Sequence, residues 1–239
     1  IPNDVTSIGE GAFQNCTGLT SIKIPKSVTN IGESAFQRCT GLKNIKIPES
    51  VTSIEFSTFS NCTSLTTIEI PGSVKSIGNF AFYKCTGLIS ISIPKSVTSI
   101  GDYAFSGCDN LTVYLEGGSE LTSESFGEVA NKVVTRWNEG DLTWTLTADG
   151  TLTISGEGAM MDYGIDGSPA AQKKDNVKKV VIEDGITSIG AAAFLGCRSL
   201  TSITIPSSVT SIGDFALSEC TGLTSINISE GVTSIGNGA

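Results

Sequence analysis

The chain has 239 residues, of which 24 are acidic and 15 are basic, and its formal net charge of −9 disfavours binding to nucleic acid or anionic membranes. It contains no histidine, so Ser-His-Asp and Cys-His catalytic groups and histidine-bound zinc are excluded. No segment approaches the roughly 20 consecutive apolar residues of a membrane-spanning helix, so no membrane insertion is expected. We therefore expect a protein that is not an enzyme and has no catalytic residue, metal site or cofactor.

A 23-residue repeat runs through the first half of the chain. Written from Leu19, it reads Leu-x-x-Ile-x-Ile-Pro-x-x-Val-x-x-Ile-Gly-x-x-Ala-Phe-x-x-Cys-x-x, and copies begin at Leu42, Leu65 and Leu88. The same spacing separates five cysteines, Cys16, Cys39, Cys62, Cys85 and Cys108. One repeat buries too few apolar side chains to offset the entropy lost on ordering it, so the repeats must stack into a solenoid.

The start of each repeat has the pattern of a short β-strand. In the copy that begins at Leu19, Ile22 and Ile24 alternate with Lys23, which predicts two side chains facing inward and one facing outward. Pro25 follows directly and ends the strand, because proline has no N–H to donate. We therefore expect one short strand in each repeat.

The rest of the repeat must return the chain to the next strand. Val28 and Ile31 are expected to point inward, and Gly32 supplies the backbone freedom of a tight bend. Ala35-Phe36-x-x-Cys39 places apolar groups at near-helical spacing, which indicates one helical or 3₁₀ turn. Phe36 is expected to fill the space between the two walls of the solenoid.

The cysteines form a regular series but not a disulfide pattern. There are seven of them, so at least one would remain unpaired. Their common place in the repeat directs the side chains in parallel toward the core rather than toward one another. We expect a ladder of small buried thiols with a structural role, and we expect most of them to be hidden from reagents.

The repeat is interrupted after Cys108. The next cysteine of the series, Cys197, lies 89 residues later, which is not a multiple of 23. Thr122 to Lys132 is predicted to form a short helix with Thr122 or Ser123 as its N-cap. One face of that helix would carry Phe126, Val129 and Val133.

A β-hairpin is predicted within the interruption, from Leu142 to Ile154. Two runs in which apolar residues alternate with threonine flank the sequence Ala148-Asp149-Gly150. A three-residue loop with a left-handed Gly150 pairs Leu146 with Leu152 and Trp144 with Ile154, whereas a two-residue loop would mix polar and apolar partners. The Trp144 face should be buried and cap the second block of repeats, reached through a loop from Gly156 to Asn176.

The second block begins with copies of the repeat at Val177, Leu200 and Leu223. Both blocks resemble the repeat of BspA-like bacterial surface proteins, most clearly from Ile93 to Leu111 and from Ile205 to Ile226. The segment Leu142 to Tyr163 resembles the cap that precedes such repeats in clostridial members. Four positions depart from the pattern and put individual turns in doubt, namely Glu55 for glycine, Thr58 for alanine, Leu217 for phenylalanine and Ser229 for proline.

The resemblance implies a leucine-rich-repeat solenoid, β-rich with short helical or 3₁₀ turns and interrupted by a β-hairpin cap segment. We expect a first repeat block at 1–115, an interruption at 116–176 and a second repeat block at 177–239. The resemblance also implies a secreted or cell-wall-attached protein of an anaerobic bacterium. Relatives of that kind are associated with adhesion to host matrix proteins or to other cells.

Two surfaces are candidates for ligand binding. Outward residues of successive strands line up on the strand face, so variable side chains there form columns, of which one is Lys23, Lys46, Glu69, Ser92 and Tyr114. Free drift of solvated positions would give the same variability. A second candidate is the aromatic group Phe80, Tyr83 and Tyr103, which suits a sugar or an apolar partner. Packing against a neighbouring turn would explain these rings equally well.

Three functions follow from these patterns. The first is a cell-surface or secreted module that adheres to a host extracellular protein, a glycan or another bacterial surface. The second is a passive cell-wall spacer that binds nothing. The third is a carbohydrate-binding accessory to an enzyme domain elsewhere in the protein.

Overall fold

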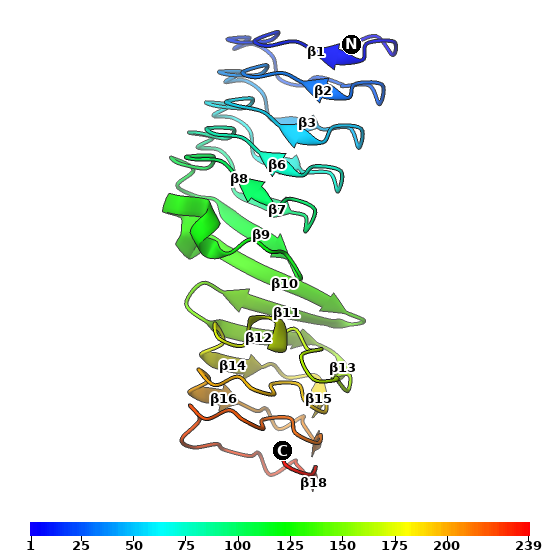
Figure 1. Ribbon diagram of the computed structural model, residues 1–239, viewed down its shortest axis with the longest axis vertical. Helices are drawn as coiled ribbons and strands as arrows, with labels where there is room; N and C mark the ends of the chain where they lie inside the picture. Colours follow the sequence, from blue (N-terminus) through cyan, green and yellow to red (C-terminus); the bar gives the residue numbers. More distant parts are fainter. The chain divides into compact units, whose positions relative to one another are not determined.

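The computed structural model describes residues 1–239 and divides into two compact units, Ile1–Val134 and Thr135–Ala239. In the first unit the repeats follow one another as successive rungs, coloured from blue to green in Figure 1. The fold is a β-rich repeat solenoid with few helical segments, as predicted. The three-part division at 1–115, 116–176 and 177–239 follows the repeat pattern rather than these compact units, and it stays a prediction.

The longer strands of the first unit form a parallel ladder. These strands are β3 (Asn44–Lys46), β5 (Thr67–Glu69), β7 (Ser90–Ile93) and β9 (Thr112–Glu116). Each pairs with the next in register, so that Ile45 lies beside Ile68 and Ile68 beside Ile91. The equivalent Ile22–Ile24 segment is not a regular strand, although Ile24 is buried.

Each full repeat also contributes a second, two-residue strand that the sequence pattern did not predict. The Ser-Ile or Asn-Ile pair on the return path forms short parallel pairings, because its isoleucine packs inward while its backbone meets the next repeat. These strands are β1 (Ser7–Ile8), β2 (Asn30–Ile31), β4 (Ser53–Ile54), β6 (Ser76–Ile77) and β8 (Ser99–Ile100).

A column of phenylalanine rings fills the first unit between its two walls. Successive rings are stacked with centroid distances of 5.3–5.6 Å. The column comprises Phe13, Phe36, Phe59, Phe82 and Phe105. Phe36 is fully buried, as predicted from its place in the repeat. The column gives each inner repeat an apolar contact with both neighbours.

The turn after Gly32 is not the helical or 3₁₀ turn that we expected. Ser34 and Arg38 have left-handed backbones with φ of 55° and 59°, which interrupts helical geometry. Gly32 was expected to supply the backbone freedom of a tight bend, but its φ is not in the left-handed region. A Cβ there would lie 2.7 Å from the backbone nitrogen of Glu10, so this position needs glycine because the preceding repeat approaches closely.

Main-chain hydrogen bonds join each turn to the following one. Three N–H groups of a turn, at every second residue, donate to carbonyl groups 22 residues later. In one pair of turns the donors Phe80, Phe82 and Lys84 reach their acceptors at 2.8–2.9 Å. The same three bonds recur between the earlier turns of the first unit. We call this arrangement the turn ladder.

A helix replaces the next turn after Cys108. The 3₁₀ helix η1 (Ser123–Lys132) has Thr122 as its N-cap and is broken at Gly127, where φ is 53°. Phe126 and Val129 are buried, as is Val133 just beyond the helix, which confirms the apolar face predicted for this segment. The Phe126 ring contacts Phe105 at 5.8 Å but is tilted by 32°. The regular ring column therefore ends here.

The second unit contains the predicted β-hairpin. Strands β11 (Leu142–Thr147) and β12 (Thr151–Gly156) are antiparallel, and Leu146 faces Leu152 across them. Gly150 has φ of 90°, so the three-residue loop and its left-handed glycine are confirmed. The strand β10 (Val133–Glu139) precedes this hairpin.

The hairpin leads directly into the later repeats. Strand β12 pairs in parallel with β14 (Lys179–Ile182), and β14 pairs with β16 (Ser202–Thr204). Short strands on the return path form a second ladder, with the members β13 (Gly158–Ala159), β15 (Ile186–Ile189), β17 (Ser211–Ile212) and β18 (Ser234–Ile235). The segment expected to be a loop thus holds β13 and the 3₁₀ turn η2 (Ala171–Lys173).

Candidate functional site

The strand-face row of the first unit is the first candidate surface. It consists of Lys23, Lys46, Glu69, Ser92 and Tyr114. Lys46 pairs with Glu69, Glu69 with Ser92, and Ser92 with Tyr114 in the strand register, so the expected alignment is present. Lys23, Lys46, Glu69 and Ser92 are exposed, and Tyr114 is half-buried.

The strand face is hollowed at two places. A hollow of about 1050 Å³ lies over the Ile22–Ile24 segment and β3 and is lined by Lys23, Asn44, Lys46 and Glu49, among others. A smaller one of about 270 Å³ is lined by residues of β5 and β7, including Glu69 and Ser92. Four of the five residues of the strand-face row therefore border a concave surface rather than a flat one. Polar groups around a hollow provide hydrogen-bonding positions for a partner.

The aromatic group predicted on the turns forms a single cluster. The Phe80 and Tyr103 rings are stacked with centroids 5.2 Å apart, and the Tyr83 ring meets Phe80 edge-on at 5.5 Å. Phe56 adds a fourth ring, 5.9 Å from Phe80. Phe56 was not predicted, because it lies one position before Ser57, the residue equivalent to Phe80 and Tyr103 in the repeat. We call these four residues the aromatic cluster.

The backbone explains why the aromatic cluster projects outward. Phe80 and Tyr103 have φ of 58° and 57°, the left-handed conformation found at this position of each turn. Tyr103 is 60% exposed and Phe56 is 42% exposed, whereas Phe80 and Tyr83 are partly covered by their neighbours. The Lys84 ammonium lies 5.1 Å from the centre of the Tyr83 ring. The rings therefore pack on one another and still present one exposed face.

The cysteines occupy the core rather than a reactive site. Six of the seven are buried, and Cys16 alone is exposed, contrary to its place in the buried ladder. The Cys62 thiol donates to the Phe36 carbonyl at 3.1 Å, and the same contact recurs at Cys39, Cys85 and Cys108. Burial raises the pKa of Cys62 to about 12, so its reactive thiolate is suppressed.

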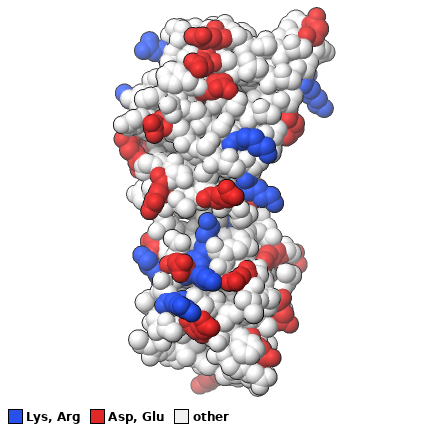
Figure 2. All heavy atoms as spheres, in the orientation of Figure 1, with Lys and Arg blue, Asp and Glu red and all other residues white.

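Charges are dispersed over the molecule. Figure 2 shows acidic and basic side chains interspersed on the visible face, without a broad basic patch. No group of three or more His, Cys, Asp or Glu side chains is arranged to hold a metal ion. No helix has the length and apolar character needed to cross a lipid bilayer.

The repeat matches that of a known protein family. A family profile described as "BspA type Leucine rich repeat region" matches in six copies, over residues 1–112 and 168–239. No curated protein matches the chain.

Several solved structures are similar to the chain. A leucine-rich repeat protein from Bacteroides ovatus is 24% identical, with a TM-score of 0.47, and the match covers 99% of this chain and 82% of that one. A leucine rich cell surface protein from Faecalibacterium prausnitzii is 28% identical, with a TM-score of 0.41 and coverage of 98% and 67%. The T. pallidum leucine rich repeat protein is 22% identical, with a TM-score of 0.43 and coverage of 92% and 72%.

Proposed function

The chain belongs to the BspA-type leucine-rich-repeat family, and on that premise we propose that it is an extracellular or cell-wall-attached adhesion module that binds a protein through the strand face of its first unit. Membership of this family supports a repeat-based binding module. The partner class proposed is an extracellular host protein or a protein on another bacterial surface. A catalytic role is not part of the proposal.

The observation that carries the proposal is the alignment of the strand-face row beside two hollows. Strand pairing holds the backbone positions that carry the outward residues of β3, β5, β7 and β9 in fixed register across the ladder. A rigid surface binds with a smaller loss of conformational entropy than a mobile one. The Lys46 ammonium and the Glu69 carboxylate lie on adjacent strands, which suits a partner with charges of both signs.

The test replaces the charged part of this row and measures binding. A Lys23→Ser, Lys46→Ser and Glu69→Ser triple variant keeps every buried side chain, so its stability should stay within about 0.5 kcal/mol of the parent protein. The assay is surface plasmon resonance against immobilised extracellular matrix proteins and mucins, followed by attachment of cells to the coated protein. We expect a saturable interaction that weakens at least about tenfold in the variant, a loss of roughly 1.4 kcal/mol.

A matched control removes the same charges from another surface. Glu33, Arg38 and Lys75 are exposed and lie outside the strand-face row, so their triple serine variant should bind like the parent protein. Equal loss in both variants would point to a general charge effect and reject the strand face as the site. Absence of any binding partner would favour a passive spacer. Binding confined to glycans would favour the carbohydrate-binding accessory.

A further inference from the structure

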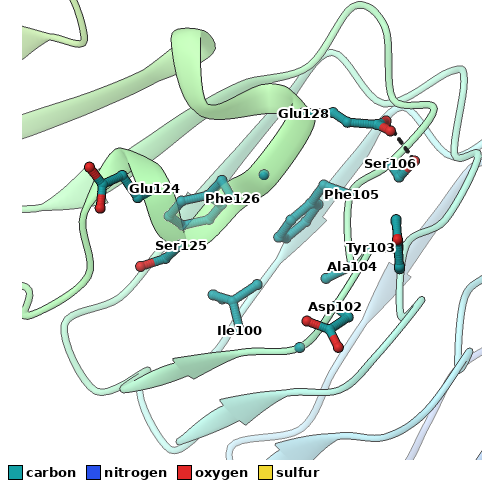
Figure 3. Close-up of a pocket in the computed structure, with 12 residues that line it drawn as sticks. Ile100, Asp102, Tyr103, Ala104, Phe105, Ser106, Glu124, Ser125, Phe126 and Glu128 are labelled. Atoms are coloured by element: carbon teal, nitrogen blue, oxygen red, sulfur yellow. Dashed lines mark hydrogen bonds between the residues drawn. The ribbon is translucent and has the colours of Figure 1, made fainter.

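A pocket of about 500 Å³ lies where the regular repeats of the first unit end. One wall is the last regular turn, from Ile100 to Ser106, and the other is the first part of η1, from Glu124 to Glu128. The pocket exists because η1 does not reproduce the next turn of the repeat. The tilted Phe126 ring takes the place of the next stacked phenylalanine, but the helix has no equivalent of the rest of that turn. Figure 3 shows the two walls, with Phe105 and Phe126 between them.

The turn ladder is interrupted at this pocket. In the four preceding turns, three main-chain N–H groups donate to the following turn. The equivalent N–H groups of Tyr103, Phe105 and Gly107 have no acceptor, because η1 presents no carbonyl groups in that register. Tyr103 and Gly107 have left-handed backbones, with φ of 57° and 74°, as do the equivalent residues of the preceding turn, so this turn keeps the backbone form of the earlier ones. These three donors are the open end of the turn ladder; Tyr103 and Phe105 line the pocket, and Gly107 follows directly after its wall.

The earlier turns show which acceptor groups pair with such a row of N–H donors. Phe80, Phe82 and Lys84 donate to the carbonyls of alternate residues in another stretch of polypeptide, at 2.8–2.9 Å. The spacing of the open donors therefore matches the spacing of alternate carbonyl groups in a peptide main chain. Proteins are known to bind a partner segment through an exposed main-chain edge of this kind. A sugar presents oxygen atoms without this regular spacing.

The side chains of the pocket specify the charge of the bound segment. Asp102, Glu124 and Glu128 line it, and no lysine or arginine does. Figure 3 shows Glu128 on one side of the pocket and Glu124 on the other. The Ser106 hydroxyl donates a 2.6 Å hydrogen bond to the Glu128 carboxylate. Tyr103 stacks on Phe80 through one face and borders the pocket as well. Three carboxylates and an aromatic ring favour a cationic side chain.

We propose that this pocket binds an extended, lysine- or arginine-containing peptide segment of a partner protein, whose main-chain carbonyls accept hydrogen bonds from Tyr103, Phe105 and Gly107. The site is separate from the strand-face row and does not depend on the function proposed for that row. Its volume falls within the range of about 300–1000 Å³ that is usual for ligand pockets.

The test is an NMR titration of the intact 239-residue chain with two synthetic peptides. Gly-Lys-Gly-Lys-Gly-Lys-Gly offers the carbonyl spacing with positive charge, and Gly-Glu-Gly-Glu-Gly-Glu-Gly offers the same backbone with negative charge. We expect saturable shifts of the Tyr103, Phe105 and Gly107 amide signals with the lysine peptide. The glutamate peptide should bind at least about tenfold more weakly.

Charge reversal makes the test specific. In a Glu124→Lys and Glu128→Lys variant the preference between the two peptides should invert. A Glu10→Lys and Glu33→Lys variant has the same net charge, carries its changes on exposed residues of the first turns, and should keep the original preference. The amide spectrum of each variant shows directly whether it is folded.

Three results would overturn the proposal. The first is an absence of shifts at the three amides when the lysine peptide is present at millimolar concentration. The second is equal binding of the two peptides, which would remove the role of the carboxylates. The third is a shift of the Tyr103 amide with chitotriose but not with the lysine peptide, which would make the pocket a sugar site.

Discussion

At the scale of single residues, the cysteines divide into one exposed thiol and six buried ones. Burial raises the pKa of Cys39, Cys108 and Cys220 to about 11 and that of Cys197 to about 12, so these thiols stay protonated at pH 8. We expect one equivalent, Cys16, to react rapidly with a thiol reagent at pH 8, and the other six only after denaturation. Mass spectrometry of the labelled peptides checks the assignment. Rapid labelling of several thiols in the folded protein would contradict the buried ladder.

The close approach of neighbouring repeats depends on glycines that are contacted by backbone atoms of the preceding repeat. A Cβ on Gly78 would lie 2.9 Å from both the Glu55 carbonyl carbon and the Phe56 nitrogen. We expect Gly78→Ala to lower the free energy of unfolding by about 1–3 kcal/mol, because two repeats must move apart. Urea denaturation measures the change.

The chain supplies a control for that substitution. A Cβ on Gly72 would have no neighbour within 4 Å, and Gly72 does not adopt a left-handed backbone. Gly72→Ala should therefore leave stability unchanged or raise it slightly, by up to about 1 kcal/mol. Similar losses at Gly72 and Gly78 would mean that close approach between repeats is not the reason for glycine.

At the scale of elements, the β-hairpin brings a tryptophan into the core of the second unit. Trp144 is fully buried, lies 5.7 Å from the Phe194 ring and meets the Tyr163 ring edge-on at 6.0 Å. Trp144→Ala should destabilise the protein by about 3–5 kcal/mol through loss of packing and formation of a cavity. Thermal unfolding followed by near-ultraviolet circular dichroism provides the measurement.

A smaller substitution separates ring packing from hydrogen bonding. The indole N–H of Trp144 is buried without a hydrogen-bond partner. Trp144→Phe keeps an aromatic ring and removes this unsatisfied donor, so it should cost clearly less than Trp144→Ala. An equal loss of stability in both variants would show that removing this N–H brings no gain and that a phenylalanine ring does not replace the packing of the indole.

Much of the architecture could be predicted from the sequence because its apolar residues are periodic. Pairing of Trp144 with Ile154 followed from matching apolar faces across a three-residue loop, and the parallel ladder followed from the 23-residue repeat. The two-residue strands were missed because alternation cannot be recognised in two residues. The turns were misjudged because left-handed residues such as Ser34 and Arg38 are not glycines.

The candidate sites were predictable to a smaller extent. The strand-face row depends only on the repeat and on alternation, so its members could be listed from the sequence. The pocket beside Tyr103 depends on main-chain donors that lose their acceptors where η1 begins. The sequence does not show which main-chain N–H groups lack an acceptor, so that site could be found only in the structure.

At the scale of the whole molecule, stability should depend on position along the phenylalanine column. Phe59 is stacked between Phe36 and Phe82, whereas Phe13 is half-buried and contacts Phe36 alone in the column. We expect Phe59→Ala to cost about 3–5 kcal/mol. Phe13→Ala should cost less than half as much, because its repeat has one stacked neighbour in the column and not two.

Amide hydrogen exchange can follow this difference repeat by repeat. Phe59→Ala should reduce protection in the flanking repeats as well as in its own, whereas Phe13→Ala should affect mainly the first repeat. Equal and uniform loss of protection throughout the first unit in both variants would show that it unfolds only as a whole.

The left-handed position in each turn affects how such repeat arrays can diverge in sequence during evolution. Serine, phenylalanine and tyrosine all occupy it in the first unit, at φ of 53–58°. At Ser34, Ser57 and Phe80 the backbone N–H donates to the next turn whatever the side chain, so the identity of the side chain is free to vary. A duplicated repeat thus inherits a complete interior together with one position at which new surface chemistry can arise. Interior and surface can then diverge at independent rates within a single copied segment.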